Sequence, residues 1–124
     1  MADKRRELGD RGERAAVAFL ENRGLEILDR NWRCSYGEAD VVALDGGTLV
    51  FCEVKTRRAG TSGIPEEAVT TAKQSRYSKI ARVYCSRTDV EYESVRFDVI
   101  AIYAFSDTQA LLRYVRGAFD ATDE

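Results

Sequence analysis

The stretch "GEADVVALDGGTLVFCEVKTR", residues 37–57, decides the fold because a tight turn joins two apolar segments within it. It predicts strands at about 38–45 and 48–57. Gly46 and Gly47 between them supply the positive φ angles that a two-residue hairpin turn requires. Apolar side chains occupy both alternating faces of each strand, a pattern typical of sheets that are covered on both sides. The hairpin is therefore expected at the centre of a layered domain.

The turn also sets a register for the hairpin. A Gly46-Gly47 turn pairs Thr48 with Asp45, Leu49 with Leu44, Phe51 with Val42 and Glu53 with Asp40. Alternation then places Ala39, Val41 and Ala43 on one face with Val50, Cys52 and Val54, and Val42, Leu44, Leu49 and Phe51 on the other. An Asp45-Gly46 turn is the alternative, and it would pair Asp40 with Phe51.

Three charged residues, Asp40, Glu53 and Lys55, interrupt these apolar strands. In the first register the side chains of Asp40 and Glu53 project from one half-buried face with their Cβ atoms roughly 5 Å apart, and Lys55 shares that face. Opposed like charges destabilise a sheet unless something lies between them. A divalent cation is one such partner, since hard ions prefer carboxylate oxygens. The alternative is an ion pair of Lys55 with Glu53 or Asp40 that has only a structural role.

The rest of the chain predicts helices on either side of this hairpin. A helix is expected over 5–23, a strand over 25–33, a helix from Pro65 to about 85, and a strand over 94–105, while 111–119 is ambiguous between strand and helix. This order indicates a single α/β domain, residues 1–124, in which helices flank a central mixed sheet, with a frayed acidic tail at about 119–124. Glu13 lies about 20° from Leu20 around the first helix, so it could lean over the sheet as a third acid.

Composition limits the chemistry. The chain of 124 residues has no histidine, which excludes histidine bases, nucleophiles and metal ligands, so carboxylates and lysine would have to act with a hard cation. The three cysteines are scattered and predict reduced thiols of a cytoplasmic protein. No apolar run reaches the length of a membrane span, and the beginning of the chain has no apolar signal segment. The net charge of −2 and the pI of about 5.3 count mildly against nucleic acid binding.

The ordered motifs "GERAAVAFLENRG", "NWR", "GEAD", "VFCEVKTR" and "RFDVIAI" resemble the YraN-type family of small bacterial proteins over residues 9–103. That family in turn resembles the PD-(D/E)XK nucleases, which have the restriction-endonuclease-like fold and include Holliday-junction resolvases. In this resemblance Asp40 matches the motif aspartate, residues 53–55 match the (D/E)XK segment, and Glu13 matches a helix glutamate. Ala39 stands where the motif has proline.

The resemblance implies an endonuclease that uses Mg²⁺ or Mn²⁺. Asp40 and Glu53 would be metal ligands together with the Val54 carbonyl, and Glu13 would bind the metal directly or through water. Lys55 would orient the attacking water and stabilise the anionic transition state. The expected partner is nucleic acid, DNA before RNA, with branched or damaged DNA as one option. A homodimer is also expected, because related resolvases are dimers.

Basic residues beside this site predict phosphate contacts. Arg57 and Arg58 follow it directly, and Lys73, Arg76, Lys79 and Arg82 recur every three residues on the second helix. We assign Arg57, Arg58, Lys73 and Arg76 to nucleic acid, and Lys79 and Arg82 to a solvated helix face.

Two other classes of function stay open. One is a nucleic-acid-binding module that does not cleave, and the other is a protein-interaction domain with a relic site. The intact Asp40, Glu53 and Lys55 favour the nuclease, whereas the acidic pI slightly favours the protein-interaction domain. Glu38 is expected to be a solvated strand-end residue rather than an accessory acid. Asp98 is expected to be a structural partner of Arg96 or of a backbone amide.

Overall fold

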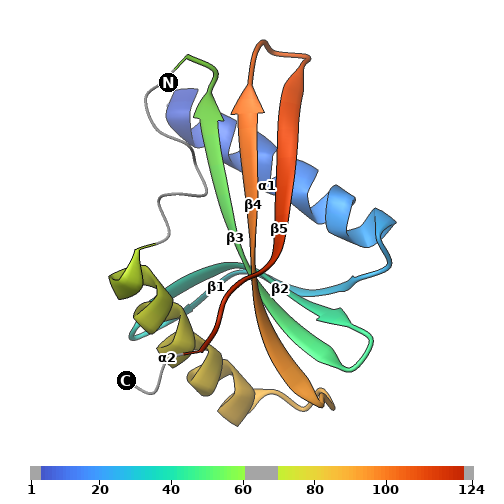
Figure 1. Cartoon of the computed structure of the whole chain (residues 1–124), viewed down its shortest axis with the longest axis vertical. Coiled ribbons are helices and arrows are strands. Elements are labelled where there is room, and N and C mark those ends of the chain that lie inside the picture. Colours follow the sequence, from blue (N-terminus) through green and yellow to red (C-terminus); the bar gives the residue numbers. More distant parts are fainter. Residues whose placement is uncertain (1–3, 61–69, 122–124) are drawn as a thin grey trace.

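A five-stranded mixed sheet with one helix on each face organises this computed structural model, which describes residues 4–60 and 70–121 (Figure 1). The helices are α1, Lys4–Asn22, and α2, Thr71–Arg87. The strands are β1 Glu26–Cys34, β2 Gly37–Asp45, β3 Thr48–Arg58, β4 Ser94–Ala104 and β5 Ala110–Phe119. The ambiguous segment 111–119 is therefore a strand.

The strands lie in the sheet in chain order, from β1 at one edge to β5 at the other. All neighbours are antiparallel except β3 and β4, which run parallel. A parallel pair needs a long crossover, and α2 lies within that connection. The arrangement confirms the expected α/β fold with a mixed sheet flanked by helices, and it is compatible with a restriction-endonuclease-like fold.

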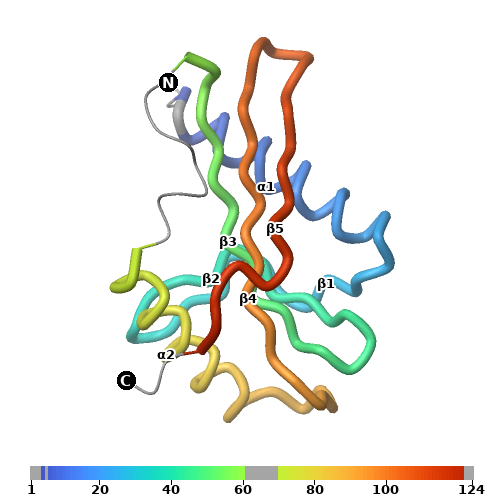
Figure 2. The backbone as a smooth tube through the Cα atoms, in the orientation of Figure 1, coloured from blue at the N-terminus to red at the C-terminus, as the bar shows by residue number. Residues whose placement is uncertain are grey.

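The two helices cover opposite faces of the sheet, so the protein has two apolar cores (Figures 1 and 2). The core on the α1 side contains Ala16, Leu20, Leu25, Val41, Ala43, Val50, Cys52, Ile100 and Ile102. The core on the α2 side contains Ala39, Val42, Leu49, Phe51, Tyr77, Ile80, Ala81, Tyr84 and Phe97. This explains why both faces of the hairpin strands are apolar.

The hairpin register predicted from the Gly46-Gly47 turn is confirmed over most of its length. Asp45 pairs with Thr48, Leu44 with Leu49, and Val42 with Phe51, which excludes the alternative turn. The ladder ends at Val41 and Cys52, one pair before the expected pair of Asp40 and Glu53. The expected position of Ala39 is wrong, because Ala39 packs in the α2-side core whereas Val41 packs in the α1-side core.

The break in alternation falls at Asp40, between these two residues. Residues two apart in a regular strand face the same way, so the switch from Ala39 to Val41 indicates a local distortion of β2 at Asp40. The β1–β2 register continues without a shift, since Trp32 pairs with Ala39 and Arg30 with Val41, and Asn31 between them has a φ of 52°. The distortion therefore turns the Asp40 side chain without inserting a residue into the strand.

The second helix begins at Thr71 in the part of the chain that the structure describes. The hydroxyl of Thr70 caps it by accepting a hydrogen bond from the Lys73 amide at 3.2 Å. The expected start at Pro65 lies outside the described residues. The helix ends at Arg87, two residues beyond the expected end.

Neither helix of the described ranges has the length and apolar character needed to cross a membrane. All three cysteines are unpaired, as expected.

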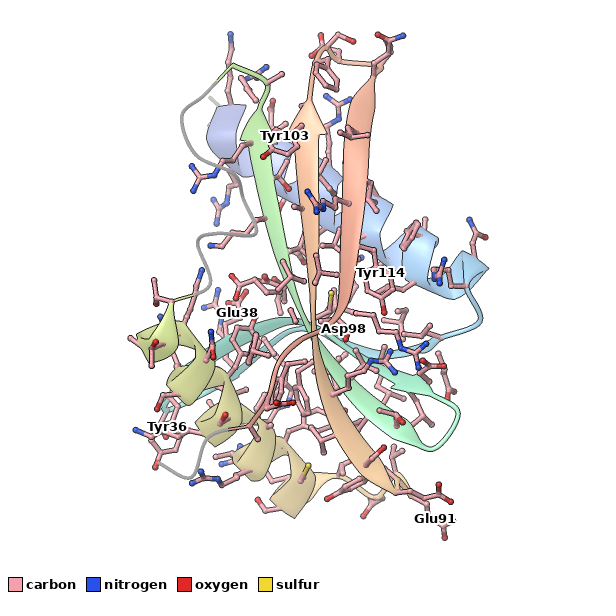
Figure 3. All side chains as sticks on the ribbon, in the orientation of Figure 1. Tyr36, Glu38, Glu91, Asp98, Tyr103 and Tyr114 are labelled. Atoms are coloured by element: carbon pink, nitrogen blue, oxygen red, sulfur yellow. The ribbon has the colours of Figure 1, made fainter. Side chains whose placement is uncertain are left out.

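Asp98 has the structural role expected of it. Its fully buried carboxylate accepts hydrogen bonds from Arg96 Nε at 2.9 Å and from the Gly117 amide at 2.8 Å, and it also accepts one from the Tyr114 hydroxyl (Figure 3). Gly117 has a φ of 62° and lies in β5, opposite the point where the register between β4 and β5 shifts. The carboxylate of Asp98 thus holds the irregular end of β5 against β4.

Asp98→Ala should lower the free energy of unfolding by about 3–5 kcal/mol, because the Gly117 amide and the Tyr114 hydroxyl lose their buried acceptor and Arg96 keeps only its ion pair with Asp45. Urea denaturation measures the change. Asp107→Ala is the control, since Asp107 pairs with Arg11 on the surface and its loss should cost less than about 1 kcal/mol. Equal, small losses for both variants would contradict the structural role of Asp98.

Candidate functional site

A cluster of acids and lysines lies where the β2–β3 ladder ends. The Val54 amide donates a hydrogen bond of 2.8 Å to Asp40 Oδ2. The carboxylate of Asp40 thereby reaches across from β2 to β3 just beyond the last ladder pair, Val41 and Cys52. The half-buried Asp40 is thus fixed in place by a backbone group of the neighbouring strand.

Glu53 provides the second carboxylate and is only 5% exposed. Its Oε1 atom lies 2.9 Å from Lys73 Nζ and 3.3 Å from Lys55 Nζ. Its Oε2 atom is buried and accepts no hydrogen bond from the described residues. One oxygen of Glu53 is therefore shared by two ammonium groups, while the other oxygen is left for a further partner.

Glu13 approaches from α1 as a third acid. Its Oε1 atom is buried without a hydrogen bond to the described residues, and Arg30 Nη2 lies 3.9 Å away. Burial raises the pKa of Glu13, although Asn31 and Arg30 oppose the change. The Glu13 charge in turn acts on Asp40, so α1 contributes to the electrostatics of a site built mainly from β2 and β3.

Burial raises the pKa of Asp40 to about 7. The hydrogen bond from Val54 opposes this rise, whereas the charges of Glu53, Glu13 and Glu38 add to it. Asp40 is therefore close to half protonated at neutral pH. A cation bound beside it would favour the ionised carboxylate.

The donor atoms are suitable for a hard divalent cation. Mg²⁺ prefers oxygen ligands and is usually held by one or two carboxylates while it keeps several waters. Asp40 and Glu53 supply such a pair, and Glu53 Oε2 has no hydrogen-bond partner among the residues that the structure describes. Within residues 4–60 and 70–121, no three acidic or cysteine side chains already form a ligand cluster, so Glu13 could take part only through water or after a movement.

Lys73 and Tyr77 are members of this cluster that sequence reasoning did not place there. Lys73 was assigned to nucleic acid, but its side chain contacts Glu53. Tyr77, one helical turn further along α2, is buried, and burial raises its pKa with added effect from the charges of Asp40 and Glu53. Lys73 and Tyr77 are four residues apart and so lie on one face of the helix, a spacing from which their common location could have been predicted.

Arg57 and Arg58 lie on opposite faces of the sheet. Arg57 shares the face of Glu53 and Lys55, and its buried Nε atom has no hydrogen bond to the described residues. Arg58 lines a depression beside α1 with Lys4, Glu7, Leu8, Arg11 and Asp107. The structure thus brings Arg57 to the site but not Arg58, whose assignment to nucleic acid stays a prediction.

The remaining charged residues lie at the margin of the site. Arg76 is exposed on α2, and its side chain passes over Gly37 at the start of β2. Glu38 pairs with Arg33 Nε at 2.7 Å, in keeping with a strand-end residue (Figure 3). Lys79 lies over the ring of Tyr36. The Lys55–Glu53 ion pair of the structural alternative is present, but Lys73 shares it.

These features define a small α/β protein with Asp40 on β2 and Glu53 and Lys55 on β3 gathered in one site. The helix α2, which connects the parallel strands β3 and β4, adds Lys73 to this site. Residues 12–102 match the model of a family described as "Uncharacterised protein family UPF0102". The chain belongs to this family, which confirms the resemblance to the YraN-type proteins.

Relatives from distant bacteria cover almost the whole chain. A UPF0102 protein of Geobacter sulfurreducens is 47% identical over 91% of this chain and 88% of its own length. UPF0102 proteins of Arthrobacter sp. and Caldicellulosiruptor saccharolyticus are 44% and 42% identical, over 89% and 93% of this chain and 93% and 98% of their own. The residues of the candidate site, from Glu13 to Tyr77, fall within the region that matches the family model.

Asp40→Asn should stabilise the metal-free protein above pH 7 by up to about 4 kcal/mol, since the pKa differs by about three units between the folded and unfolded states. The carboxyl group of Asp40 ionises near pH 4 in the unfolded protein and near pH 7 in the folded protein. Between these two values the folded protein keeps a proton that the unfolded protein has lost, so the free energy of unfolding falls as the pH rises through this range. Asparagine stays neutral and can still accept the Val54 hydrogen bond.

Thermal melts in chelator at pH 4 and pH 8 measure this difference. The two proteins should melt alike at pH 4, and the variant should melt higher at pH 8. A lower melting temperature of the variant at pH 8 would mean that lysines stabilise the Asp40 carboxylate in a structural ion-pair network.

Proposed function

We propose that this protein is a metal-dependent endonuclease that hydrolyses phosphodiester bonds of DNA in the cytoplasm. The main support is the convergence of a buried carboxylate, Glu53, a half-buried one, Asp40, and two lysines at the end of the β2–β3 ladder. Burying acids is costly, and replacing a buried ionic cluster by apolar residues is often neutral or stabilising. A cluster of this kind in the middle of a sheet is therefore better explained by chemistry than by folding.

Asp40 and Glu53 would hold Mg²⁺ or Mn²⁺, with the Val54 carbonyl as a further ligand by family resemblance and Glu13 acting through water. When bound, such an ion lowers the pKa of a coordinated water and neutralises charge on the phosphate. Two observations support this assignment: Glu53 Oε2 has no hydrogen-bond partner among the described residues, and burial raises the pKa of Asp40, a change that a bound cation would oppose.

Lys55 would act on the reacting phosphate. Its ammonium group lies 3.3 Å from Glu53 Oε1, so a small rotation suffices to turn it from the carboxylate to an oxygen of the attacking water or the phosphate. There it would orient the water and stabilise the developing negative charge. Lys73 could remain on Glu53 and keep that carboxylate oriented.

Arg57 and Arg76 are the proposed phosphate contacts on either side of the cluster, and Lys73 adds positive charge between them.

We include in the proposal a homodimer acting on branched DNA, as the resemblance to resolvases implies. Two sites in one dimer could each cut one strand of a branched substrate. Light scattering with and without a four-way DNA junction tests the dimer separately from cleavage.

Cleavage should require Mg²⁺ or Mn²⁺, and Glu53→Gln or Lys55→Met should lower its rate by about 10²–10³. Labelled branched, single-stranded and duplex DNA substrates measure the rate, with chelator as the metal-free reference. Glu38→Gln is the matched control, since it removes a nearby acid at the margin of the site and should keep most activity. Metal-dependent cleavage that survives both site variants would refute the assignment.

One observation favours a second candidate. Two ammonium groups already neutralise Glu53, as they would in a module that binds nucleic acid without cutting it. In that case Mg²⁺ or Mn²⁺ would not raise the melting temperature. A metal that binds only the folded nuclease would raise it by mass action.

A further inference from the structure

Part of the sheet next to the candidate site is not covered by a helix in the described structure. In Figures 1 and 2, α1 lies behind the outer parts of β3, β4 and β5, and α2 lies against the other end of the sheet, over β2. The outer parts of β3, β4 and β5 therefore present one face that neither helix occupies. This face begins at Glu53 and extends toward the β4–β5 turn.

Strand pairing shows which side chains form this face. Lys55 pairs with Ala101, which pairs with Arg113, and one step outward Arg57 pairs with Tyr103, which pairs with Leu111. Paired residues of neighbouring strands project from the same face. The alternate residues Val54, Ile102 and Leu112 pack against the α1-side core, so these two rows face the other way. We call Lys55, Arg57, Tyr103, Leu111 and Arg113 the open strand face.

The open strand face has a distinct charge. Its two rows contain three cations and no acid, although the whole chain has a net charge of −2. The Arg57 Nε atom has no hydrogen-bond acceptor among the described residues, and Arg113 is exposed. Positive charge is thus concentrated beside a site that would act on a polyanion.

The same face has an apolar row at its outer end. Leu111 is 55% exposed, and its partner Tyr103 is half-buried on β4 (Figure 3). This row lies four residues beyond Glu53 along the strands, a distance of roughly 13 Å. Aromatic rings flanked by cations are the usual platform for unpaired bases, because bases stack on the ring while phosphates contact the cations.

We propose that the open strand face binds a single-stranded DNA segment that leads out of the active site. A paired base hides its faces within the duplex and could not stack on Tyr103, whereas an unpaired base could. The proposal rests on the proposed function, because the bound strand is the substrate of that site. It specifies the substrate further as DNA with a single-stranded flank, such as a flap, a gap or the arm of an opened junction.

Binding in chelator tests this inference apart from cleavage. Fluorescence anisotropy would compare a labelled oligothymidine with a blunt duplex. Wild type should bind the single strand more tightly, Tyr103→Ala should weaken this binding about tenfold, and Tyr103→Phe should retain it. Arg57→Gln and Arg113→Gln should each lower the salt slope of binding by about 0.7. Arg14→Gln is the control, since Arg14 is exposed on α1, which covers the opposite face of the sheet, and its loss should leave binding unchanged.

Several results would overturn the inference: no single-strand binding by wild type at low salt, tighter binding of the duplex, or equal losses for Arg57→Gln and Arg14→Gln. Thermal melts show whether each variant is folded, and Tyr103→Phe keeps the ring if Tyr103→Ala unfolds. Failure of the nuclease proposal looks different. In that case the open strand face would still bind single-stranded DNA, but no DNA substrate would be cleaved in Mg²⁺ or Mn²⁺.

Discussion

The hydrogen bond from the Val54 amide to the Asp40 carboxylate is the contact on which the candidate site depends. It replaces a regular ladder pair at the point where β2 and β3 separate, and it accompanies the reversal of alternation between Ala39 and Val41. A regular strand would have continued the ladder and placed Asp40 directly opposite Glu53. The distorted strand instead places the Asp40 carboxylate against a backbone donor, the Val54 amide. It leaves Glu53 to the two lysines.

Charge balance explains the rest of the arrangement. Glu13, Asp40 and Glu53 belong to three different elements. The negative charge at the site is therefore produced by the fold and not by acids that are close together in the sequence. Lys55 and Lys73 offset part of it at a single oxygen of Glu53, and Arg30 lies near Glu13. Burial raises the pKa of Asp40, and the charges of Glu53, Glu13 and Glu38 add to the rise.

Local sequence signals predicted the elements well where two signals agreed. The Gly46-Gly47 turn and the doubly apolar strands together determined the hairpin register. Residues 111–119 were ambiguous because Arg113, Arg116 and Gly117 break the alternation, and only pairing with β4 shows that they form a strand. The contact between Lys73 and Glu53 was not predictable, because it depends on how α2 crosses the sheet. By contrast, the separation of Arg57 from Arg58 follows from simple alternation.

Each edge strand has a register shift against its neighbour in the sheet. On β1 the register shifts between Ile27 and Asp29, and Asn31 has a φ of 52°. On β5 the bulge beside Gly117 is held by Asp98. Regular edges can template the addition of strands from other molecules, and bulges and charged residues are the common defence against this. Both exposed margins of the sheet are therefore poor templates for intermolecular strand pairing, which protects a small, strand-rich protein against aggregation.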